Sequence, residues 1–166
     1  GKGSTSEISL LIEGSIVGPS TGNPVDISIT NESSSADSTI VLNSDSNKTI
    51  GTGINDVTLS ASKVELYGNI TTVVNSSESG DVSITGATTL KDHIAIDTSS
   101  SNGTITFSST VDGAKNLDLL SGTGKVDIAG DLGADTALTT LDINATDGSG
   151  TIEINDIGTS SAAGVT

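Results

Sequence analysis

The sequence predicts an all-β protein, a parallel β-helix (β-solenoid) of about six to seven coils. Three observations lead to this prediction. Apolar and polar residues alternate over many short segments, which is typical of half-buried strands. Runs of Gly, Ser, Asn and Asp, which favour turns, separate these segments, and similar segments recur after roughly 18–26 residues.

The composition fits a narrow, repeated interior. The 166 residues include one Tyr, one Phe and no Trp, Met or Cys. An irregular globular core normally uses aromatic side chains and Met to fill its space. We therefore expect an interior of Val, Ile, Leu and Ala.

Two kinds of strand segment alternate along the chain. The first has the loose form apolar-x-apolar-x-small, and its members begin at Ile8, Ile40, Val64, Val82, Ile105, Val126 and Ile152. The second is shorter, and its members begin at Val25, Val57, Thr72, Ile94, Leu117 and Leu141. From residue 64 onward the first kind recurs after 18, 23, 21 and 26 residues. Each pair of segments is expected to form one coil.

Stacked coils place equivalent residues on one another, so the repeats predict inward ladders. Small residues at the third inward place of each repeat would let the chain turn a corner tightly. The first ladder comprises Val64, Val82, Ile105, Val126 and Ile152, the second Leu66, Ile84, Phe107, Ile128 and Ile154, and the third Gly68, Gly86, Ser109 and Gly130.

An antiparallel β-sandwich is the alternative fold, in which neighbouring segments would pair as hairpins. A sandwich has no reason to repeat at this period, and its inner faces usually need larger side chains. We expect residues 1–166 to form a single solenoid segment, a fragment of a longer chain. Longer loops are predicted at 17–24, which contains both prolines, and at 31–37.

Charge excludes one class of function. The net charge is −15, with only six Lys and Arg residues, so the basic surface that nucleic-acid binding requires is missing. No apolar run approaches the ~18 residues of a membrane-spanning segment. We therefore expect neither nucleic acid as a partner nor insertion into a membrane.

The stretch "ITFSSTVDGAKNLDLLSGTGKVDIAGDLGADTALTTLDINA", at 105–145, resembles the repeats of giant bacterial surface proteins. These are the filamentous-haemagglutinin-like and autotransporter-like adhesins, and the similarity is clearest over 80–158. The resemblance implies a right-handed β-helix, secretion to the cell surface, and a role as a stalk, filament or adhesin. It implies no catalytic residue.

Acidic residues recur at similar places in the repeats, and stacked carboxylates could bind Ca²⁺. The candidate ligands are Asp127, Asp131, Asp147 and Asp156. The opposing interpretation is that outward Asp residues keep the surface soluble and its edges apart. The sole histidine, His93, is predicted to share a strand face with Asp97, either as a metal or acid–base group or as a solvated corner.

The functional prediction is a structural segment of a secreted or cell-surface bacterial protein, located outside the cell and requiring no cofactor. Its expected partners are further coils or another copy, joined end to end, and cell-surface glycans. The alternative is a β-helix enzyme or binding module acting on polysaccharide. Six dispersed basic residues and two aromatic ones argue against an enzyme for acidic glycans, so we predict no enzymatic activity.

Overall fold

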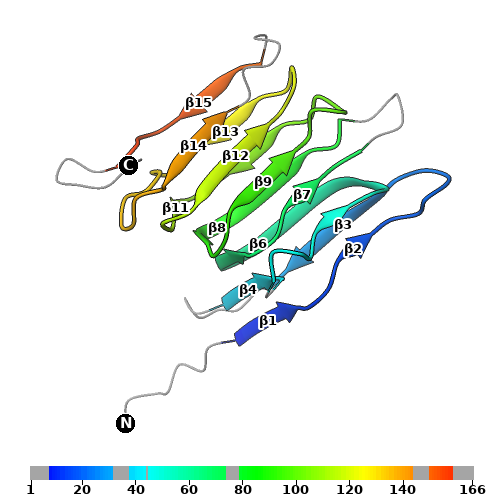
Figure 1. The fold of residues 1–166 in the computed structure, drawn as a ribbon, viewed down its shortest axis with the longest axis horizontal. Coiled ribbons are helices and arrows are strands. Elements are labelled where there is room, and N and C mark those ends of the chain that lie inside the picture. Colours follow the sequence, from blue (N-terminus) through cyan, green and yellow to red (C-terminus); the bar gives the residue numbers. More distant parts are fainter. Residues whose placement is uncertain (1–7, 32–37, 44, 74–78, 144–149, 159–166) are drawn as a thin grey trace.

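The computed structural model describes residues 8–31, 38–43, 45–73, 79–143 and 150–158. These residues form a parallel β-solenoid. Figure 1 shows the strands stacked in chain order, from β1 at one end to β15 at the other. Every strand pair within the described residues is parallel, which confirms the predicted fold class and excludes the antiparallel sandwich.

The strands lie in three rows, and each coil passes through the rows in turn. The first row contains β1 (Ile8–Ile12), β4 (Ser38–Leu42), the second halves of β6 (Ile54–Leu66) and β8 (Val82–Leu90), and β11 (Val111–Asp112). The second row is β2 (Ile16–Val17), β5 (Ile50–Gly51), β7 (Ile70–Thr71), β9 (Ile94–Asp97), β12 (Asn116–Leu120) and β14 (Thr140–Ile143). The third row is β3 (Val25–Thr30), the first halves of β6 and β8, β10 (Ile105–Phe107), β13 (Val126–Ile128) and β15 (Ile152–Ile154).

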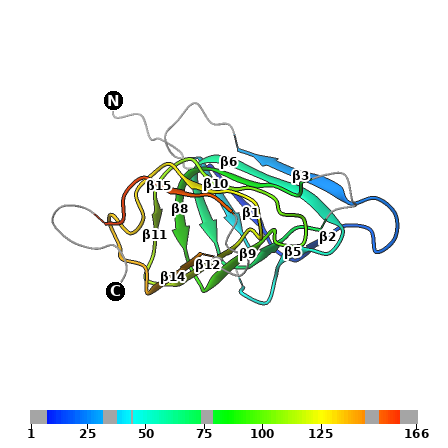
Figure 2. The same ribbon diagram turned by 90° about the horizontal axis from the view of Figure 1, so that it is seen from above.

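Each coil has three strand positions, whereas the repeats predicted two. Figure 2 shows the cross-section, with β3 and β6 along one long side and β5, β9 and β12 along the opposite side.

Apolar side chains from all three rows fill the interior. Phe107 is the largest of them, and around it Val, Ile and Leu dominate. Strand alternation points every second side chain inward, and each inward side chain contacts its counterpart in the next coil. This arrangement confirms the predicted ladder from Val82 through Ile105 and Val126 to Ile152.

The predicted start of that ladder is wrong. The partner of Val82 in the preceding coil is Val57, whereas Val64 pairs with Ile40 and Thr88. The reason is that β6 is one strand of 13 residues that belongs to two rows, with a register shift between Ser60 and Lys63 in its pairing with β8. The two segments that the sequence assigns to different strand types are thus halves of one strand.

A glycine marks the corresponding bend in β8. Gly86 has φ of +122°, and a Cβ there would collide with the carbonyl oxygen of Ala61. Only glycine adopts this conformation readily and permits this approach. The small residue predicted at this corner therefore has a direct cause in the packing of consecutive coils.

At the first predicted loop, 17–24, β2 ends at Val17 and β3 begins at Val25, so residues 18–24 connect the two strands. Pro19 and Pro24 both lie in this connection, which Figure 2 shows projecting beyond the end of the cross-section. Of the second predicted loop, only Asn31 is described, and 32–37 lie outside the described residues. No helix that is long and apolar enough to cross a membrane occurs in the described part of the chain.

Candidate functional site

Outward aspartates join successive coils at the corner before the third row. The Asp56 carboxylate accepts a hydrogen bond from the main-chain N–H of Asp81 at 2.8 Å. The Asp81 carboxylate accepts one from the N–H of Thr104, also at 2.8 Å. Such charge-assisted bonds satisfy corner amides that the strand ladders leave unpaired. These carboxylates therefore hold the stack together, a role that goes beyond solubility.

The same device recurs at the other corners. The Asp112 carboxylate accepts the N–H groups of Asp135 at 2.8 Å and Thr136 at 3.0 Å. The side-chain oxygen of Asn69 accepts the N–H of Ala95 at 2.8 Å. In each case the donor and the acceptor are roughly one coil apart in the sequence. The repeat therefore allows such contacts, but their partners can be identified only when the register between coils is known.

Of the four candidate calcium ligands, the three that lie within the described residues belong to no group that could hold a metal ion. Asp127 accepts a bond from Lys125 at 2.9 Å, and Asp131 accepts one from the Asn155 amide at 2.8 Å. Asp156 is exposed near the end of the stack, and Asp147 lies outside the described residues. Within the described ranges, no three His, Asp or Glu side chains are grouped to hold a metal ion. Calcium binding stays a prediction.

His93 is exposed and contacts the next coil. Its Nε2 lies 2.8 Å from the Asp118 carboxylate on β12. The predicted neighbour Asp97 instead accepts hydrogen bonds from the main chain and hydroxyl of Ser99. Asp92 accepts the N–H of His93, and this bond lowers the pKa of Asp92 from its ordinary value of 3.8. The histidine thus links two coils.

Lysine side chains add ion pairs between coils. Lys91 lies 3.0 Å from Glu65, and Lys125 lies 2.8 Å from Glu153 and 2.9 Å from Asp127. The bond to Glu153, followed by that to Asp127, raises the pKa of Lys125 from its ordinary value of 10.5. The ion pairs of Lys91 with Glu65 and of Lys125 with Glu153 therefore join successive coils.

The two ends of the stack present a different surface. At the first coil Leu10 is 40% exposed, although its strand partner Ile40 is fully buried. At the last coil Ile152 is 49% exposed, although its partner Val126 is fully buried. These side chains occupy inward positions of edge strands, and within the described residues no further coil covers them. Such edges are ready to pair with another strand.

No protein-family model, curated protein or solved structure matches the chain. The resemblance to surface adhesins therefore stays a prediction. The function has to be argued from the stack itself and from the chemistry of its outward faces.

Proposed function

We propose that this chain is a structural segment, a section of stalk or filament, of a secreted or cell-surface bacterial protein of the adhesin type. The observation that supports it best is the pair of exposed ends. Both end coils repeat the strand pattern of the central coils, yet their inward apolar side chains are only half buried. Another coil on either end would complete their burial.

The stacking direction favours a linear assembly. All strands in the described part of the chain are parallel, so the first and last coils present different edges, and contact between them is head to tail. A head-to-tail contact that does not close into a ring extends into a filament. Continuation of the same chain with further coils has the same geometry. We therefore propose more coils or another copy of the chain as the partner at each end.

The sides of the solenoid suit an extracellular rod. The carboxylates of Asp56, Asp81 and Asp112 accept hydrogen bonds from the main chain of the next coil, and these bonds resist bending and sliding of the coils. The net charge of −15 makes the sides of neighbouring rods repel one another. Contact is then directed to the ends, where apolar side chains are exposed.

Electron microscopy of the native protein that contains this chain tests the proposal. The expected result is long, unbranched rods a few nanometres wide. A compact particle would contradict it. Sedimentation of the chain itself supplies a second readout, in which Ile152→Lys should reduce self-association while Thr106→Lys, on the outward side of β10, should not.

A further inference from the structure

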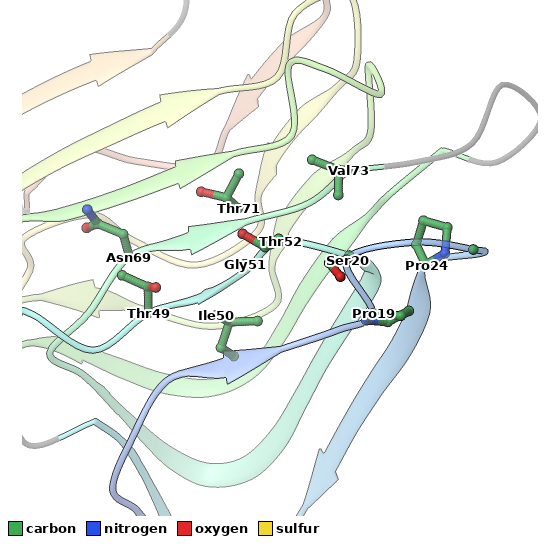
Figure 3. A pocket seen from close by; sticks show the side chains of 12 residues that line it. Pro19, Ser20, Pro24, Thr49, Ile50, Gly51, Thr52, Asn69, Thr71 and Val73 are labelled. Atoms are coloured by element: carbon green, nitrogen blue, oxygen red, sulfur yellow. The ribbon is translucent and has the colours of Figure 1, made fainter.

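We propose that a pocket between the 18–24 connection and the outward face of β5 and β7 binds an uncharged saccharide unit. The pocket has a volume of about 540 Å³, within the range of small-molecule sites. Figure 3 shows Thr49, Asn69 and Thr71 on the sheet side and Pro19 and Pro24 on the loop side. This assignment depends only on the pocket, and it does not depend on the proposed role of the chain as a section of stalk or filament.

The lining selects for a neutral, hydroxyl-rich ligand. It contains no Asp, Glu, Lys, Arg or His, in a chain with 27 charged residues (6 basic and 21 acidic). A charged ligand would lose water there without gaining a partner of opposite charge. The lining instead combines hydroxyl and amide groups with the apolar surfaces of the prolines and Val73. Sugars present this mixture of hydroxyls and C–H surface.

The polar groups are held in place by the coils beneath them. Asn69 uses its side-chain oxygen to accept the N–H of Ala95, which fixes the amide and leaves its Nδ2 group to donate to a ligand. Thr49 and Thr71 flank it in the same outward face, from the preceding coil and from β7 itself. A preorganised donor set reduces the entropy lost on binding.

The pocket is open at its sheet side because residue 51 is a glycine and has no side chain. Gly51 lies in the outward row between Val17 and Thr71, where any other residue would fill part of the pocket. A Cβ at Gly51 would meet the Cβ of Thr71 at 3.6 Å, an ordinary contact. The backbone therefore tolerates a side chain here, and the fold does not require this glycine.

The wall opposite the sheet is held in place, and the residue that accepts one of its hydrogen bonds has a strained backbone. The 18–24 connection is tied at both ends, by bonds from Gly18 N–H to Thr52 C=O at 2.8 Å and from Val25 N–H to Gly53 C=O at 3.0 Å. Thr52, which lines the pocket, has φ of +51°. A β-branched residue rarely adopts this left-handed conformation, and such strain concentrates at ligand sites.

NMR titration of the ¹⁵N-labelled chain tests the proposal. The probes are cellobiose, lactose and N,N′-diacetylchitobiose, each added to tens of millimolar, with digalacturonic acid as a charged comparison. We expect at least one neutral disaccharide to shift the amide signals of Gly51, Gly53 and Thr71, with millimolar affinity, and the acid to bind more weakly. No shift with any neutral probe, or stronger binding of the acid, would overturn the assignment.

Three variants complete the test. Gly51→Val should weaken binding at least ~10-fold by filling the hollow, a loss that corresponds to about 1.4 kcal/mol. Asn69→Asp keeps the acceptor for Ala95 but removes the donor, and should also weaken binding. Thr106→Val, an outward threonine on β10 away from the pocket, is the matched control. Unchanged affinity in both pocket variants, with a retained fold, would contradict the site.

Discussion

The central coils and the end coils have the same strand pattern but differ in burial. In the third row, Ile105 and Val126 are fully buried, whereas Ile152, which follows them in the same ladder, is 49% exposed. The first row shows the same contrast between Ile40 and Leu10. The apolar alternation of a strand therefore determines which side chains point inward, and the neighbouring coil determines whether they are buried.

A charge introduced into the inward ladder should give the largest difference in lost stability between the central coils and the end coils. Ile128 is 1% exposed, and Ile128→Asp should cost at least about 4 kcal/mol, because the carboxylate would be buried without a partner. Ile152→Asp, at the open end, should cost far less. Denaturant unfolding followed by circular dichroism measures both. Unchanged unfolding of Ile128→Asp would contradict the register.

Truncation of one ladder position sharpens the same contrast. Ile105→Ala should cost about 2–5 kcal/mol, since it leaves a cavity between two coils. Ile152→Ala removes the same atoms from a half-exposed site and should cost less than about 1 kcal/mol. Equal losses in denaturant unfolding would show that the last coil is covered in solution, by other residues or by a second copy.

The aspartates that accept hydrogen bonds from the next coil should show a smaller difference in stability between variants. Asp81→Ala leaves the Thr104 amide without its acceptor and should cost about 1–3 kcal/mol, whereas Asp81→Asn keeps an acceptor oxygen and should cost less. Asp131→Ala loses only an exposed side-chain bond to Asn155 and should stay within about 0.5 kcal/mol. Thermal unfolding of the three variants ranks them. An Asp81→Ala variant as stable as the parent would refute the joining role.

The smallest effect concerns Lys125, which connects the last two coils. Its pKa is raised by Glu153 and Asp127, so its ion pairs stabilise the fold below the ordinary value of 10.5 and are lost as pH rises through the raised value. Lys125→Gln should lower the Tm slightly at pH 8, and the difference should shrink above pH 10.5. A difference that persists at higher pH would assign the effect to packing of the lysine stem instead.

The sequence predicts the fold class and the later part of the inward ladder, because both follow from local alternation and its recurrence along the chain. It does not predict the split of β6 between two rows. The apolar residues change from odd positions, Val57 to Ala61, to even positions, Val64 and Leu66, but the sequence does not show that one continuous strand spans this change. A third strand position is also missed where the strands are short, since β5, β7 and β11 have two residues each.

The outward chemistry could be predicted less well, because it depends on the register. Asp81 and its partner amide at Thr104 are 23 residues apart, and only the stack brings them together. The pocket combines Pro19, Gly51 and Thr71, which lie on three successive coils. Neither this hydrogen bond nor the pocket lining produces a local sequence motif.

The register between β6 and β8 is the central claim, and paired cysteines test it most directly, because the chain has no cysteine of its own. Thr58 and Ser83 are direct neighbours, so Thr58→Cys with Ser83→Cys should form a disulfide readily on mild oxidation. Glu65 lies beside Thr89, so Glu65→Cys with Ser83→Cys should stay reduced. Efficient cross-linking of the second pair, with none in the first, would contradict the three-row solenoid.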